Sequence, residues 1–216
     1  MRCRWYVASR VFAVVLLSHA VLAQQPLKQP IAPSPSPANA KAAASDAEDV
    51  YRNTTFGFNY KIPFGWVNRT KEMSQDSSPD SNDSKKSILL LAMFEHPPEA
   101  SGDSVNSAIV VAAEEVASYP GLRSAEQYFG PLTELTKSKG LTVVNEPYEF
   151  RLGEMQLVRG DFSKPLGNLT MYQSTLVVIE KGYVVSFTFI GGSEDEADQL
   201  VEGLTFSRKE TPASRK

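Results

Sequence analysis

The segment Leu169–Ile190, LTMYQSTLVVIEKGYVVSFTFI, decides the fold. Residues that favour strands, β-branched and aromatic, fill both halves of it, and Lys181-Gly182 separates the halves as a turn. Strands joined by so short a connection are antiparallel, because a parallel connection needs a dozen residues or more. The segment therefore predicts two neighbouring antiparallel strands, 169–179 and 183–190.

Four further segments have the length and composition of strands. ILLLAMF at 88–94 is apolar throughout, which is typical of a strand buried on both faces. SAIVVAAEEV at 107–116 is expected to lie beside it, with Glu114 in a solvated strand end. The segments 141–151 and 154–163 are joined to each other and to the next strand by short turns, so they are antiparallel neighbours too.

The stretch Phe56–Trp66, FGFNYKIPFGW, is rich in aromatic residues. It predicts a strand that ends at Pro63, followed by a second short strand that begins at Gly65. Alternate residues of a strand share a face, so three of the aromatics project to the same side. We interpret them as core residues and Trp66 as the cover of one end of the sheet; a peptide-binding platform is the alternative. The three aromatics are Phe56, Phe58 and Tyr60.

Two helices are predicted on either side of the last strands. Ser124 suits a helix N-cap, with Gln127 three residues later, and this helix is expected to end at Gly140. Pro131 lies inside it and is expected to kink it or to split off a first turn. Ser193 caps the second helix, whose first turn carries three acids, as the helix dipole favours. The fold class is therefore α+β, an antiparallel β-sheet flanked by helices.

The first 23 residues have the features of a cleavable secretory signal peptide. Three arginines and no acid precede the apolar run 11–23, which is short for a membrane span of roughly 20 residues. Small residues before Gln24 fit a cleavage site. The sequence predicts export to the periplasm or the medium, with no membrane span after cleavage. An uncleaved leader that holds the protein at a membrane surface is the alternative, which a mature N-terminus at Gln24 would exclude.

The mature chain divides into one domain and flexible segments. Residues 24–48 are rich in Pro, Ala and Ser and predict a disordered linker, because they cannot bury enough apolar surface to offset backbone ordering. Residues 49–208 predict a single globular domain. Within it, the polar insertion 74–86, SQDSSPDSNDSKK, is expected to be a mobile loop, and residues 209–216 a disordered tail.

Charge and cysteine content exclude several functions. Removing the three arginines of the leader from the 22 basic residues leaves 19 against 25 acidic ones, a net charge of −6. Lys and Arg cluster only at Lys85-Lys86 and the C-terminus, so nucleic-acid binding is not expected. Cys3, in the leader, is the only cysteine. The mature chain therefore has no disulfide, no thiolate nucleophile and no cysteine-based metal site.

No catalytic, cofactor-binding or metal-binding residue is predicted. The motifs GxSxG, HExxH, GxGxxG and GxxxxGK[ST] are missing. His96 stands beside Glu95, but no nucleophile can be placed near it, so a solvated loop histidine is the preferred interpretation. One mature histidine cannot form a histidine-rich zinc site. Asp76, Asp80 and Asp83 lack the spacing of an EF-hand calcium loop.

A series of short motifs resembles the PsbP-like family, whose fold is shared with the Ran-binding Mog proteins. The likeness covers residues 50–207, and it implies an α-β-α sandwich and an accessory or binding role rather than catalysis. The leader lacks the composition of a chloroplast transit peptide, so an exported bacterial relative is expected. The motifs are Tyr51-x-Asn53, Phe56-Gly57-Phe58, Ile62-Pro63, Gly65-Trp66, Gly182-Tyr183 and Leu204-Thr205-Phe206.

Two functions follow as hypotheses. The preferred one is an exported, non-enzymatic accessory or binding protein that acts through a protein–protein surface, with another envelope or secreted protein as its partner. The alternative is a ligand carrier or enzyme with an unrecognised pocket between helix and sheet. Such a pocket would use polar residues that no motif marks, namely Arg159, Asp161 or Tyr172.

Overall fold

The computed structural model describes residues 49–76, 87–97 and 103–207. The predicted signal peptide, the linker 24–48 and the C-terminal tail lie outside the described residues, as does most of the predicted mobile loop 74–86. The first three residues of that loop, 74–76, belong to the helix α1, Thr70–Asp76. A loop was the wrong expectation for them, because Met73 packs into the core and fixes the helix.

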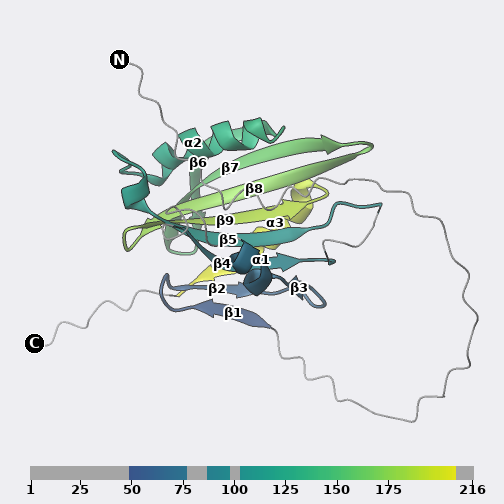
Figure 1. Ribbon diagram of the computed structural model, residues 1–216, viewed down its shortest axis with the longest axis horizontal. Coiled ribbons are helices and arrows are strands. Elements are labelled where there is room, and N and C mark those ends of the chain that lie inside the picture. The colour runs from purple at the N-terminus through teal and green to yellow at the C-terminus, as the bar shows by residue number, and fades with distance from the viewer. Residues whose placement is uncertain (1–48, 77–86, 98–102, 208–216) are drawn as a thin grey trace, which may run out of the picture.

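Seven antiparallel strands form the main sheet (Figure 1). Their order is β3-β4-β5-β9-β8-β7-β6, so the strands predicted between 141 and 190 are confirmed as antiparallel neighbours. Pairing of β5 with β9 joins this half of the sheet to the earlier strands. The strands are β3 (Val67–Asn68), β4 (Ser87–Phe94), β5 (Ala108–Glu115), β6 (Thr142–Leu152), β7 (Met155–Leu166), β8 (Leu169–Glu180) and β9 (Tyr183–Gly191).

Two-residue turns close the last three hairpins. Lys181 and Gly182 both have positive φ, 51° and 80°, which is the backbone of a type I′ turn. In the other two turns only the first residue has positive φ, Gly153 at 61° and Gly167 at 64°, as in type II′ turns. These turns match the right-handed twist of the strands and set the pairing register of β6, β7, β8 and β9.

A second, three-stranded sheet has the order β1-β2-β10. Its central strand, β2 (Phe58–Lys61), is the strand predicted in the aromatic stretch, whereas β1 (Val50–Asn53) and β10 (Leu204–Phe206) are short strands that were not predicted. Both flank β2 in antiparallel register. The sheet therefore joins the two ends of the domain.

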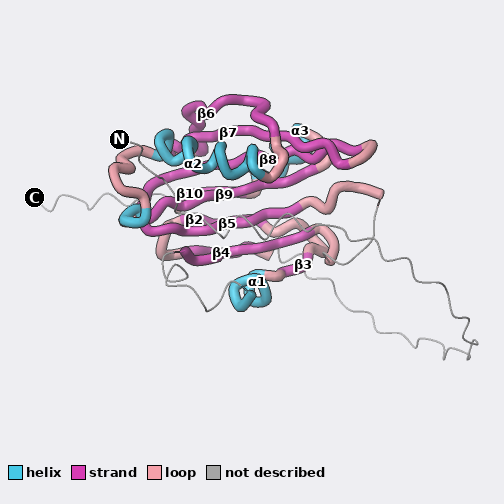
Figure 2. The backbone as a smooth tube through the Cα atoms, turned by 45° about the horizontal axis from the view of Figure 1, so that its top comes forward, coloured by secondary structure: helices cyan, strands magenta, loops and turns pink. Residues whose placement is uncertain are grey.

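The main sheet is covered on both faces. On one face lie α2 (Ala125–Ser138) and α1, the first against β6, β7 and β8 and the second against β4 (Figure 2). On the other face lie α3 (Glu194–Glu202) and the three-stranded sheet, which share one hydrophobic core with the main sheet. The antiparallel sheet flanked by helices is confirmed. The α-β-α sandwich is found only in part, since strands make up much of one outer layer.

Both predicted helices begin at their predicted caps. The Gln127 N–H donates to Ser124 Oγ at 3.4 Å, and the Glu196 N–H donates to Ser193 Oγ at 3.1 Å. Pro131 lies inside α2, which is one continuous helix. A 3-10 turn, η2 (Val116–Ser118), follows β5.

The aromatic stretch divides between core and surface. Phe56, Phe58 and Tyr60 are buried in the core that the two sheets share. Strand alternation accounts for Phe58 and Tyr60 on β2, whereas Phe56 lies in the turn before β2 and not on the predicted strand. The ring of Phe58 packs edge-on against Phe187 of β9, with the centroids 5.0 Å apart. Trp66 is half-buried against the same core. The core interpretation is therefore confirmed for four of the aromatics, and the fifth is a surface residue described below.

Candidate functional site

Arg159 and Asp161 lie two residues apart on β7 and face the side of the sheet that carries α3. Their side chains are about a tenth exposed, 11% and 10%. Strand pairing places Tyr148 of β6 opposite Arg159, and Ser174 of β8 opposite Asp161. The two residues thus stand at the centre of a polar cluster built by three strands and one helix.

Every oxygen of the Asp161 carboxylate accepts hydrogen bonds. Oδ1 accepts from Arg159 Nε at 2.8 Å and from Ser174 Oγ at 2.7 Å. Oδ2 accepts from Asn145 Nδ2 at 3.1 Å and from the Tyr148 hydroxyl at 3.4 Å. Four donors from β6, β7 and β8 therefore surround this carboxylate and fix its position.

The Arg159 guanidinium reaches from β7 to α3. Its Nη2 donates to Ser174 Oγ at 2.9 Å and to Asp198 Oδ1 at 2.5 Å. Its Cζ lies 5.4 Å from the ring centroid of Phe150, within range of a cation–π interaction. Burial alone lowers the pKa of Arg159, but the hydrogen bonds to Asp161 and Asp198 outweigh it, and the pKa is raised.

The cluster holds β6, β7, β8 and α3 together. The Arg159 guanidinium donates to the carboxylates of Asp161 and Asp198 and to the hydroxyl of Ser174. Tyr148 is the most exposed aromatic residue of the cluster, at 40%. Burial, and after it the charge of Asp161, raises the pKa of the Tyr148 hydroxyl. Tyr172, the third residue named from the sequence, is half-buried on β8 two residues before Ser174 and so lies on the same face.

Phe64 is the remaining aromatic residue of the stretch Phe56–Trp66 and is fully exposed, at 106%. It occupies the second position of a turn in which Trp66 N–H donates to the carbonyl of Pro63 at 3.4 Å and Gly65 has a φ of 83°. A positive φ at the third position fits a type II turn and favours glycine. The turn is held from both sides, since Ile62 N–H donates to the carbonyl of Asp49 at 2.7 Å and Trp66 packs into the core.

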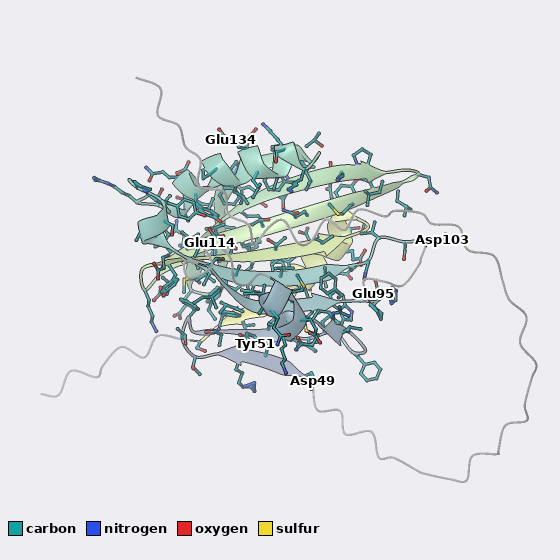
Figure 3. The ribbon with its side chains drawn as sticks, in the orientation of Figure 1. Asp49, Tyr51, Glu95, Asp103, Glu114 and Glu134 are labelled. Carbon is teal, nitrogen blue, oxygen red and sulfur yellow. The ribbon has the colours of Figure 1, made fainter. Side chains whose placement is uncertain are left out.

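His96 lies at the surface, as predicted. Its side chain is half-exposed, and its Nε2 lies 3.7 Å from an oxygen of Glu95, so the two neighbouring side chains approach each other rather than point apart. Asn106 fixes the backbone of His96 with two hydrogen bonds of 3.0 Å. Glu95 and Asp103 lie at the opposite end of the sheet from Glu114 (Figure 3).

The prediction that Glu114 belongs to a solvated strand end is wrong. Only 4% of this residue is exposed, because η2 and the start of α2 fold over the end of β5. Its Oε2 accepts hydrogen bonds from the Tyr119 and Tyr128 hydroxyls, the second at 3.4 Å. Burial, and after it the charge of Glu114, raises the pKa of Tyr128 well above its usual value.

The described residues contain neither a cluster of metal ligands nor a membrane-spanning helix. In residues 49–76, 87–97 and 103–207 no three His, Cys, Asp or Glu side chains are grouped as metal ligands would be. Of the three aspartates compared with a calcium loop, Asp80 and Asp83 lie outside the described residues, and Asp76 ends α1. None of the helices in the described part of the chain is both long and apolar enough to cross a bilayer.

The sequence matches no protein-family model and no curated protein. Solved structures do resemble the chain. PsbP (CyanoP) from Synechocystis sp. PCC 6803 is 13% identical with a TM-score of 0.45, over 78% of this chain and 98% of that one. The Ran-binding protein Mog1p from Saccharomyces cerevisiae is 13% identical with a TM-score of 0.41, over 72% of this chain and 83% of that one.

A third similar structure is LpqN of Mycobacterium tuberculosis, a protein involved in cell envelope biogenesis. It is 14% identical with a TM-score of 0.39, over 76% of this chain and 88% of that one. The resemblance to PsbP and Mog proteins noted in the sequence is therefore confirmed as a similarity to solved structures of that group. Every TM-score is below 0.5, so these likenesses say nothing of what the chain binds.

Proposed function

We propose that the protein is an exported, non-enzymatic accessory or binding protein, and that the turn carrying Phe64 is its contact with a protein partner. The observation that carries the proposal is the full exposure of Phe64 on a turn that is itself held in place. Single exposed apolar side chains are common and need no partner. Phe64 differs because its backbone is fixed on both sides, so a partner that buries the ring orders little else.

The size of the expected effect follows from the area of the ring. Fully burying a phenylalanine side chain contributes about 1.5–3 kcal/mol, and 3 kcal/mol corresponds to more than a hundredfold in affinity. The partner should therefore present an apolar pocket of the size of one aromatic ring. Since the leader predicts export, an envelope or secreted protein is the proposed source of that pocket.

The alternative function, a ligand carrier or enzyme, would rest on Arg159, Asp161 and Tyr172. The hydrogen bonds of the first two go to each other and to neighbouring strands and α3. A catalytic carboxylate needs a free face toward its substrate, whereas both oxygens of Asp161 already accept from the protein. This arrangement supports a structural role for the cluster and favours the binding function.

A photo-crosslinking amino acid at position 64 tests the proposal in the cells that produce the protein. Position 166 is the matched control, because Leu166 is also an exposed apolar residue but lies on the β7–β8 hairpin. The expected result is one defined crosslinked product from position 64 and none from position 166. Equal products from both positions, or none from position 64, would overturn the proposal.

Export is tested separately by sequencing the N-terminus of the protein recovered from the envelope and the medium. Cleavage should leave Gln24 as the first residue. An intact Met1 would exclude the cleavable signal peptide and favour the uncleaved leader. The proposed domain limits, 49–208 with the linker 24–48 before it, predict that limited proteolysis of the mature chain removes the linker first.

A further inference from the structure

We propose that two copies of the chain pair along β6, antiparallel and about a two-fold axis at Phe150, so that the main sheets join into one. This surface is separate from the Phe64 turn and the inference goes beyond the proposed function. β6 is one of the two edge strands of the main sheet, since among the described strands it pairs with β7 alone. An exposed edge strand presents unpaired backbone groups that a second chain can use.

The two halves of β6 differ as edges. In the first half the register shifts between Val143 and Asn145 and again between Asn145 and Tyr148, and Pro147 has no backbone N–H to donate. Such bulges and prolines are the usual protection of an edge against pairing. The second half, Tyr148–Leu152, is in regular register with β7 and has neither. Only this half is open to a further strand.

The backbone groups of this half point in the direction that the pairing needs. The β6–β7 turn has two residues, so the flanking pair Leu152 and Met155 exchanges hydrogen bonds, and every second pair does the same. The residues between them, Glu149 and Arg151, direct their N–H and C=O groups away from β7. In a two-fold pairing centred on Phe150, Glu149 of one copy stands opposite Arg151 of the other, and these two exchange backbone hydrogen bonds.

In this register the side chains of Tyr148–Leu152 in one copy are complementary to those of the same segment in the other copy. Glu149 and Arg151 are both exposed, and neither has a salt bridge within the described part of the chain. The two-fold pairing places opposite charges across from each other twice. On the other face it places Tyr148 opposite Leu152 of the second copy, and the two Phe150 rings together. A parallel, in-register pairing would instead set Glu149 on Glu149, so the charge order selects the antiparallel dimer.

Charge reversal tests this arrangement in the full mature chain. Sedimentation equilibrium from micromolar to millimolar protein should show a monomer–dimer equilibrium for the wild type. Glu149→Arg or Arg151→Glu alone turns two favourable pairs into two repulsive ones, and each should raise the dimer dissociation constant about tenfold or more. The double variant Glu149→Arg/Arg151→Glu restores opposite charges and should return the constant to within about threefold of the wild type.

The restored double variant separates a specific pairing from general damage to the fold. Both charges are exposed, so circular dichroism and the unfolding midpoint of all variants should match the wild type. A wild type that stays monomeric at millimolar concentration would overturn the proposal. The proposal would also be overturned if neither single reversal changes the dimer dissociation constant, because the interface would then lie elsewhere.

Discussion

The ring of Phe129, on α2, lies directly against Gly160 on β7. A Cβ atom at residue 160 would lie 2.6 Å from Cε1 and 3.1 Å from Cδ1 of that ring, closer than packed carbon atoms approach. Both residues are buried on the face that carries α2. The helix therefore sits close to the sheet at this point because the strand has no side chain there.

Replacing Gly160 with alanine should destabilise the domain by about 1–3 kcal/mol, since the methyl group forces either the ring or α2 to move. Urea unfolding followed by circular dichroism measures this change. Combining Gly160→Ala with Phe129→Leu should recover part of the loss, because the smaller side chain leaves room. A Gly160→Ala variant as stable as the wild type would show that α2 shifts without cost.

Strand order on the C-terminal side could be predicted from the sequence because long β-rich segments alternate with turns that allow one connection only. β1 and β10 could not, because strands of three or four residues carry no period and exist only through β2 between them. The helix α1 could not be predicted either, because it is short and depends on the packing of Met73 in the core.

The polar cluster could be predicted only in part. Arg159 and Asp161 were candidates from residue type alone, but their partners depend on strand register. Counting back from the two-residue turns that follow Leu152 and Leu166 places Tyr148 opposite Arg159 and Ser174 opposite Asp161. The turn between β6 and β7 was expected at residues 152–153, whereas it lies at 153–154, and this difference changes every predicted pair between the two strands. Asp198 on α3 has no sequence signal, because its contact depends on how the helix packs.

Removing the guanidinium from the polar cluster should be severely destabilising. Arg159→Ala leaves the buried Asp161 carboxylate without its charged partner, and the loss of a partner from a buried pair costs about 3–5 kcal/mol. Thermal and urea unfolding measure it. The double variant Arg159→Ala/Asp161→Asn should be more stable than Arg159→Ala alone, since no unpaired charge stays buried. If the double variant is instead less stable than Arg159→Ala, then the packing of the Arg159 stem, rather than its charge, stabilises the cluster.

Phe64 and Trp66 should respond in opposite ways to substitution. Trp66→Ala removes a half-buried ring from the main core and should cost about 1–3 kcal/mol of unfolding free energy. Phe64→Ala removes a fully exposed ring and should change stability by less than about 0.5 kcal/mol. Chemical unfolding of both variants checks this. If Trp66→Ala leaves stability intact and abolishes partner binding, the tryptophan belongs to the binding surface and its core interpretation fails.

Stability should fall as the pH rises above about 10, the usual tyrosine pKa. Burial raises the pKa of Tyr60 and of Tyr128, so both keep their protons in the folded state while the unfolded chain loses them. Fewer protons on the unfolded state mean that unfolding becomes easier with pH, by about 1.4 kcal/mol per pH unit for each such tyrosine until its folded pKa is reached.

Tyr128→Phe should therefore reduce the slope of unfolding free energy against pH, measured between pH 10 and 11, by about 1 kcal/mol per pH unit, because the unfolded tyrosine is only partly ionised in this range. Below pH 9 the slope should match that of the wild type, because tyrosine is neutral in both states. Tyr60→Phe is the matched comparison: its hydroxyl donates to the Leu200 carbonyl at 2.8 Å, so this variant also loses about 1 kcal/mol at neutral pH. An unchanged alkaline slope in Tyr128→Phe would show that Tyr128 ionises in the fold as readily as in water, and that α2 does not seal the end of β5.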